Sequence, residues 1–149
     1  MKALMYYKIL YLILIIITLL FTSCIKTTSA KEVMEYQITD IIEDVVTDFN
    51  FNQLDNLMTN FSSSFYHNER DFDEEKHFWQ SLLYQYTSVS IDSVSITLQS
   101  NNMVIASFDI TFENSSTTQT YNEPSNEFGD LSYFIREDGK WKIIGKNEW

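Results

Sequence analysis

Two histidines, one cysteine and scattered acids are the side chains of this sequence that are able to perform chemistry. His67 and His77 are its only imidazoles. A metal centre needs three or four clustered ligands, which these two residues and isolated acids do not supply, so we expect no metal and no cofactor. The acidic run that begins at Asp71 lacks the mid-loop glycine of a calcium loop. Three glycines leave no phosphate-binding loop, and no Ser, Cys or Thr lies in a recognisable nucleophile motif.

The lone cysteine ends an apolar segment at the start of the chain. Lys2 and Lys8 precede a run of Leu, Ile and Tyr, and the run closes with Leu20-Phe21-Thr22-Ser23-Cys24. A basic start, an apolar stretch and small residues before a cleavage point are the parts of a secretory signal. The last five residues resemble a bacterial lipobox, although Phe21 stands where Leu is usual. We therefore expect residues 1–23 to be a lipoprotein signal peptide and Cys24 to carry palmitate and anchor the protein to a membrane.

An uncleaved membrane anchor is the alternative for the same segment. Only uncharged residues lie between Lys8 and Lys26, just short of the roughly 20 needed to cross a bilayer. The position of Cys24 and the polar segment after it favour lipidation, with residues 24–31 as the lipidated cysteine and a flexible tether. Ile25 is not the Asp that retains enteric lipoproteins at the inner membrane. The expected location is thus extracytoplasmic, at the cell membrane or, in a cell with two membranes, the outer one.

Charge limits the partners of the mature protein. Loss of residues 1–23 leaves 126 residues, one domain by length, with eight Lys and Arg against 21 Asp and Glu, a formal charge of −13. Such a surface repels phosphate backbones and argues against nucleic acid as a partner. A lone cysteine also excludes an internal disulfide, so the fold depends on its aromatic-rich core.

Residues 34–86 carry the apolar period of helices. A stripe at steps of three and four predicts a first helix, followed at Asn52 by the N-cap of a second, short helix. Asp71 with Glu74 three positions later predicts the start of a third helix, and Phe65–His67 is expected to form a brief strand before it. The expected buried residues of the three helices are Met34, Ile38, Ile41, Ile42, Val45, Val46 and Phe49, then Leu54, Leu57, Met58 and Phe61, then Trp79, Leu82, Leu83 and Tyr86.

From Thr87 onward apolar residues alternate with polar ones, as in strands. The phase slips at Asp92-Ser93, which predicts a bulge or bend. The next strand, 104–112, has Phe108 and Ile110 on one face and Asp109 on the other. The polar segment 114–127 is expected to be a long loop or a poorly paired edge strand.

Two registers are possible for the last hairpin, residues 131–146. A two-residue turn at Asp138-Gly139 sets Ile135 opposite Lys142 and mixes charge into the apolar face. A three-residue loop, 137–139, instead pairs Ile135 with Trp141. Burial of a large apolar side chain contributes about 1.5–3 kcal/mol, more than turn preference, so we predict the three-residue loop. Its apolar face would hold Leu131, Tyr133, Ile135, Trp141 and Ile143.

Three N-terminal helices followed by four or more antiparallel strands predict an α+β fold with the helices on one face of a curved sheet. This order, the segment 49–57 and the hairpin 134–145 resemble the NTF2-like superfamily, which includes nuclear transport factor 2, ketosteroid isomerase and SnoaL-like cyclases. The resemblance covers about residues 32–149, although many relatives have Gly-Asp where this chain has Asn52-Gln53. It implies a cone with a pocket at its wide end, which serves catalysis in some members and binding in others.

The isomerase-like members place a general-base carboxylate just after the first short strand and an oxyanion-stabilising Tyr on the long helix. Laid on this sequence without gaps, the base position falls at Asn68 or Glu69. The Tyr position falls at about Val45, which has no hydrogen-bond donor. Glu69 also stands in a charged run that continues to Asp73, so a solvated loop charge is the simpler interpretation.

The two histidines have different expected roles. His77 lies one helical turn after Asp73, which favours a surface ion pair or cap. His67, on the brief strand, is the histidine that is able to point into the pocket.

Three functions remain open. The first is a lipid-anchored NTF2-like domain that binds a small apolar ligand or an envelope protein without catalysis. The second is an isomerase or hydratase that uses Glu69 or Asp109 as base with His67 or a Tyr as donor. The third is a structural subunit of an envelope complex, which would expose a large apolar patch. The mismatch at Val45 favours the first.

Overall fold

The computed structural model describes residues 29–124 and 131–146. The expected signal peptide, Cys24 and most of the expected tether lie outside these residues. Two compact units are distinguished, Met1–Ala30 and Lys31–Trp149, and the fold described here is that of the second. Among the described residues, no helix combines the length and the apolar character needed to cross a membrane.

The described residues contain three helices, as expected. They are α2 (Ala30–Asn50), α3 (Leu54–Met58) and α4 (Phe72–Gln85). The stripe on α2 is confirmed, because its fully buried residues are Met34, Ile38, Ile42, Val45 and Phe49. Ile41 and Val46 are partly buried against the same core.

The predicted cap of the short helix is wrong, whereas that of α4 is confirmed. Asn52 has a φ of +57°, so it forms a left-handed turn, and the cap position of α3 is Gln53, which makes no side-chain capping bond. At the start of α4, Asp71 accepts hydrogen bonds from the backbone N–H groups of Asp73 and Glu74, both at 3.0 Å. Glu74 accepts from the N–H of Asp71, which completes a capping box.

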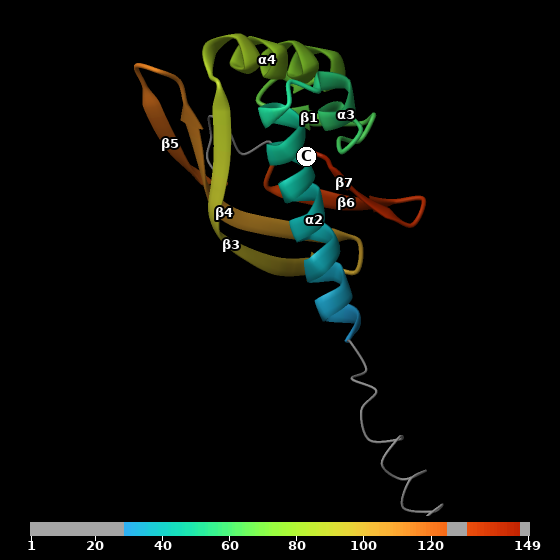
Figure 1. Ribbon diagram of the computed structural model, residues 1–149. Coiled ribbons are helices and arrows are strands. Elements are labelled where there is room, and N and C mark those ends of the chain that lie inside the picture. The colour runs from blue at the N-terminus through green and yellow to red at the C-terminus, as the bar shows by residue number, and fades with distance from the viewer. Residues whose placement is uncertain (1–28, 125–130, 147–149) are drawn as a thin grey trace, which may run out of the picture. The chain divides into compact units, whose positions relative to one another are not determined.

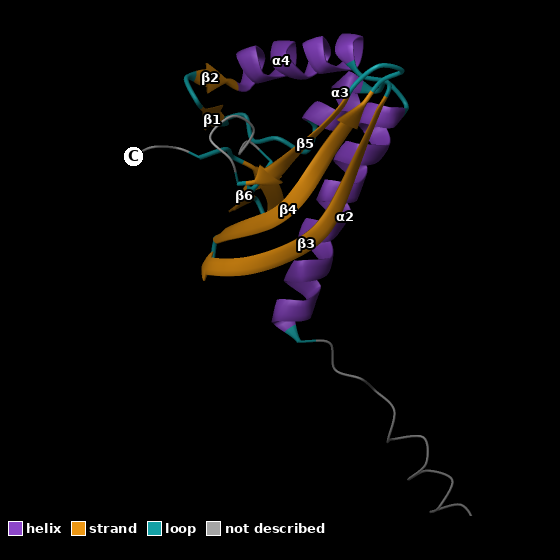
Figure 2. Ribbon diagram, turned by 90° about the vertical axis from the view of Figure 1, so that its left-hand side faces the viewer, coloured by secondary structure: helices purple, strands orange, loops and turns teal. Residues whose placement is uncertain are grey.

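A five-stranded antiparallel sheet forms the other layer. Its strands are β3 (Ser88–Ser100), β4 (Met103–Glu113), β5 (Thr118–Glu123), β6 (Tyr133–Glu137) and β7 (Lys140–Ile143). The order is β3-β4-β6-β7, and β5 pairs with the half of β4 that β6 leaves open. Figures 1 and 2 show α2 along one face of the long strands β3 and β4, with α4 across one end. The predicted α+β architecture is therefore confirmed.

The bulge in β3 and the strand β5 can be compared with the sequence predictions. The β3–β4 register shifts between Asp92 and Ser95, and Ser93 has a φ of +60°, so the predicted bulge is present. The part of the polar segment 114–127 that is described forms β5, which pairs with β4 from Thr118 to Glu123. Of the two alternatives for this segment, the strand is correct, but its described part pairs regularly with β4 and is not poorly paired.

The predicted register of the last hairpin is wrong. Phe134 pairs with Ile143 and Arg136 with Trp141, so the turn is the two-residue Asp138-Gly139. Both turn residues are left-handed, with φ of +48° and +81°, as a type I′ turn requires. Trp141 and Ile143 are buried as expected, but Phe134, not Tyr133 or Ile135, fills the interior beside them. The favoured turn therefore forms without loss of apolar burial, because Phe134 supplies it.

Candidate functional site

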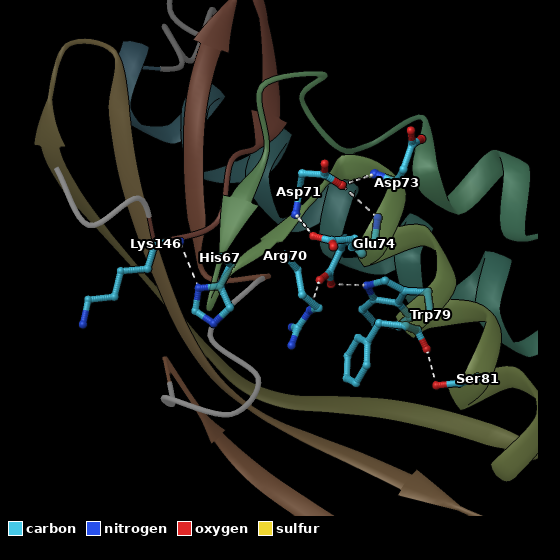
Figure 3. Close-up of polar contacts among 10 residues, drawn as sticks. His67, Arg70, Asp71, Asp73, Glu74, Trp79, Ser81 and Lys146 are labelled. Carbon is cyan, nitrogen blue, oxygen red and sulfur yellow. Dashed lines mark hydrogen bonds and ion pairs between the residues drawn. The ribbon is translucent and has the colours of Figure 1, made fainter.

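A short hairpin before α4 brings polar side chains into the interior. Its strands are β1 (Tyr66–His67) and β2 (Arg70–Asp71), and His67 pairs directly with Arg70. The turn residues Asn68 and Glu69 have φ of +49° and +66°. Residues that pair directly across an antiparallel hairpin project to the same side, so His67 and Arg70 lie next to each other (Figure 3).

Arg70 is tied to a carboxylate that is completely buried. Its Nε donates to Oε2 of Glu75 at 2.7 Å, and the indole Nε1 of Trp79 donates to Oε1 at 2.8 Å. The guanidinium also stacks 4.2 Å above the ring centre of Phe78. Both oxygens of Glu75 are therefore engaged, and the Glu75–Arg70 pair joins α4 to the hairpin.

One nitrogen of the same guanidinium remains available. Nη2 of Arg70 is buried and has no hydrogen-bond acceptor among the described residues. A buried donor without a partner costs about 1–3 kcal/mol, which an acceptor supplied by a ligand or by water would recover.

His67 is also buried, at 3% exposure. Its Nδ1 accepts a hydrogen bond from the backbone N–H of Lys146 at 3.1 Å. The neutral ring must therefore carry its proton on Nε2, which is itself buried. Gly145 makes this contact possible, because a Cβ there would lie 2.6 Å from the carbonyl oxygen of Tyr66.

A second buried polar group lies where β5 ends and β6 begins. The hydroxyl of Ser132 donates to Oε2 of Glu123 at 3.1 Å, and both residues are buried. Burial, and secondarily the charge of Glu123, raise the pKa of Tyr133 above its ordinary value. This tyrosine therefore stays protonated at neutral pH.

The two acids considered as bases do not share a site with His67. Glu69 is exposed at the tip of the β1–β2 turn. Asp109 lies on the face of β4 opposite to the buried Phe108 and Ile110, pairs with Asp92 across the sheet and accepts a hydrogen bond from Asn122. Val45 is buried on α2 and offers no donor. The described structure thus brings His67 next to Arg70, not next to either acid.

Glu75 was not foreseen as a buried residue. It belongs to the acidic run that begins at Asp71, yet it lies four positions before Trp79, on the same face of α4. That helical spacing is the sequence signal that would have identified it. An acid on the buried stripe of a helix needs a partner. Arg70 is the nearest cation before Glu75, and the adjacent Lys76 binds Asp55 instead.

The predicted ion pair of His77 is wrong. His77 is exposed and, within the described ranges, pairs with neither Asp73 nor another acid. It lines a polar cleft of about 780 Å³ between the start of α3 and α4. There Lys76 binds Asp55 at 2.7 Å, and this hydrogen bond and charge lower the pKa of Asp55. In residues 29–124 and 131–146, no three His, Cys, Asp or Glu side chains gather as metal ligands would.

Comparison with known proteins identifies the fold and not a close relative. No protein-family model matches the sequence, and no curated protein resembles it. An NTF2-like protein of unknown function from Shewanella oneidensis is 14% identical with a TM-score of 0.56, covering 73% of this chain and 93% of that one. An NTF2-like protein of unknown function from Pseudomonas putida is 9% identical with a TM-score of 0.59, covering 76% and 83%.

An enzyme has a similar structure. A hexachlorocyclohexane dehydrochlorinase is 12% identical with a TM-score of 0.57, covering 77% of this chain and 83% of that one. Identities this low establish architecture and leave activity open. The described part of residues 31–149 has the NTF2-like fold.

Proposed function

We propose that the protein is a lipid-anchored binding module of the bacterial cell envelope, in which residues 32–149 bind a ligand or partner without catalysis. One observation carries the proposal. Nη2 of Arg70 is a buried hydrogen-bond donor without an acceptor among the described residues. The carboxylate next to Arg70, that of Glu75, already accepts hydrogen bonds at both oxygens.

A general base must accept a proton from its substrate within hydrogen-bond reach. Glu75 accepts from a guanidinium and an indole, and the loss of either bond inside the protein is costly. Glu69 is exposed and Asp109 lies on the opposite face of the sheet. The arrangement favours holding an acceptor over removing a proton.

The ligand that suits this site is small and mainly apolar, with one carboxylate or carbonyl oxygen. That oxygen would accept from Nη2 of Arg70, and the ligand body would contact aromatic side chains such as Phe78, which already packs against the guanidinium. A charged acceptor gains more from a guanidinium than a neutral one does.

Calorimetric titration of the full chain in detergent tests the binding, with 2-naphthoate as probe and 2-methylnaphthalene as the matched compound without an acceptor. We expect micromolar binding of the naphthoate only, weakened about tenfold or more by Arg70→Lys, which keeps the charge and removes Nη2. Equal affinity for both compounds, or an unchanged affinity in the variant, would contradict the proposed ligand site.

The absence of catalysis needs its own measurement. We expect no isomerisation of a β,γ-unsaturated ketosteroid, followed by the ultraviolet absorbance of the conjugated product. If turnover were observed, and Glu69→Gln or Asp109→Asn abolished it without unfolding the protein, the isomerase alternative would replace the binding module.

The anchor is tested in cells. A palmitate analogue should label the wild-type protein and not Cys24→Ser, and the mature protein should begin at Cys24. A mature protein that retains Met1 would instead favour the uncleaved membrane anchor.

A structural role in an envelope complex has less support. The most exposed large apolar side chains in the described ranges are Tyr36, Phe51 and Tyr84, which lie on α2, after α2 and on α4. They are spread over several elements, whereas a subunit interface gathers such residues into one patch.

A further inference from the structure

β3 stands at the end of the described sheet order, with β4 on one side only. At its start, the side-chain amide of Asn50 donates to the carbonyl of Val89 at 3.0 Å and accepts from its N–H at 2.8 Å. These are the two bonds that a neighbouring strand would make. Because backbone groups alternate in direction along a strand, the N–H and C=O of Ile91 point to the same free edge.

The free edge continues beyond the bulge. Ile96 pairs with Ala106, whose N–H bonds to the carbonyl of Ser132 on the far side of β4. The polar groups of Ile96, like those of Ala106, therefore point away from the β3–β4 ladder. An open edge of this length is a template for another strand unless the protein blocks it.

An apolar groove runs beside this edge. It has a volume of about 390 Å³ and lies between α2 and β3, with Ile42, Val46, Ile91 and Val94 as its apolar lining. Along α2 the lining extends from Thr39 to Thr47, roughly 12 Å at the rise of a helix. A strand of four residues has about the same length, so the groove matches a short extended segment.

Acids surround the groove. Glu43 belongs to its lining, and Asp40 and Asp44 are exposed on the same helix. On the outer face of the sheet, Asp92 pairs directly with Asp109. Like charges opposite each other destabilise a sheet, and a cation between them would relieve the repulsion. The same acids disfavour pairing of β3 with a second copy of this chain.

We propose that the groove between α2 and the free edge of β3 binds an extended peptide of a partner protein in which apolar residues alternate with Lys or Arg. The peptide adds a strand to β3, its apolar side chains enter the groove, and its basic side chains face Asp92 on the outer surface. This peptide site specifies a partner for the binding role proposed above. It is separate from the site at Arg70, so it does not depend on naphthoate binding or on lipidation of Cys24.

Fluorescence anisotropy tests the site, with the full chain in detergent and a fluorescein-labelled octapeptide of alternating Val and Lys. We expect micromolar binding that weakens with added salt. A peptide of alternating Val and Glu should bind at least about tenfold more weakly, because it meets like charge. Methylation of alternate peptide nitrogens should cause a similar loss if strand addition is the mode, because it removes the donors. If either the Val-Glu peptide or the methylated peptide bound as tightly as the Val-Lys peptide, the proposal would be overturned.

Substitutions locate the binding. Val94, 38% exposed, lines the groove, so Val94→Lys should weaken the Val-Lys peptide at least about tenfold without unfolding the protein. Tyr84 on α4 is 83% exposed and outside the groove, so Tyr84→Lys is the matched control and should bind normally. Equal weakening by the two variants would show that the added positive charge, and not a change in the groove, reduces the affinity, and would overturn the proposal.

Sedimentation and hydrogen exchange complete the test. The amides of Ile91 and Ile96 should exchange more slowly when the peptide is bound. If the chain dimerises and Val94→Lys makes it monomeric, a second copy occupies the edge and the peptide proposal fails.

Discussion

Replacement of Glu75 by Leu is the sharpest test of the buried polar cluster. Glu75 is completely buried and accepts from Nε of Arg70 at 2.7 Å and from Nε1 of Trp79 at 2.8 Å. Leu is similar in size and fills the space. The variant therefore removes the charge and both acceptors and leaves Arg70 and Trp79 with buried donors.

The expected loss of stability is large. Removal of one partner of a buried ion pair typically costs about 3–5 kcal/mol, because the other charge remains in the interior. A domain of this size has a free energy of unfolding of about 5–15 kcal/mol, so Glu75→Leu should remove about a fifth of it or more. Urea unfolding followed by tryptophan fluorescence measures the loss as a lower midpoint at an unchanged slope.

A double-mutant cycle separates this mechanism from simple repacking. Arg70→Met alone also leaves a buried charge, whereas Arg70→Met with Glu75→Leu leaves none, so the double variant should be more stable than Glu75→Leu. We expect a coupling energy of about 2 kcal/mol, since contacting residues are not additive. Losses that add within about 0.5 kcal/mol would refute the ion pair as the reason that Glu75 is buried.

Four further predictions address the backbone, the register and the charges. Gly145→Ala should cost more than about 2 kcal/mol in urea unfolding, because φ is +73° and the new Cβ would meet the carbonyl oxygen of Tyr66. Glu69→Gly should raise the free energy of unfolding by about 0.5–1 kcal/mol, seen as a higher urea midpoint, because glycine is better suited to φ of +66°. Phe134→Ala should cost about 3–5 kcal/mol in the same assay and Ile135→Ala clearly less, and equal losses would contradict the register. Burial, and secondarily the charge of Asp44, raise the pKa of Asp48. The stability linked to protonation of Asp48 is therefore present at low pH and is lost as pH rises through that pKa. Asp48→Asn, which removes the charge, should increase Tm at about pH 7 and not at about pH 3.

The elements that the sequence predicted well are those with a regular period. The apolar stripe of α2 and the alternation of β4 involve many residues, so one exception does not change the result. The bulge in β3 was visible because a slip of one residue exchanges the two faces of a strand. The cap of α4 was predictable because Asp71 and Glu74 satisfy each other's backbone groups locally.

Turns were harder to predict, because the chain has three glycines and places other residues in left-handed conformations. Asn52 was assigned as a helix cap, yet Asn also tolerates a positive φ, and the structure uses that property. Nothing in the sequence marks Glu69 for the same conformation. The last hairpin follows the turn preference of Asp138-Gly139, because in that register Phe134 supplies the buried apolar side chain beside Ile143.

The buried polar residues show why function was harder to predict than fold. Asp71 caps α4, Arg70 beside it reaches Glu75 on the next turn, and His67 across the hairpin holds the backbone of Lys146. Of these contacts, the one between His67 and Lys146 joins segments that are far apart in the sequence, so no local pattern reveals it. They fix the hairpin to α4 and to the residues after β7, and they use both oxygens of Glu75 and the Nδ1 atom of His67. Because both of its oxygens are committed to the fold, Glu75 has little left for proton transfer. The donor that remains, on Arg70, suits the capture of an acceptor, so we favour a binding role over an isomerase.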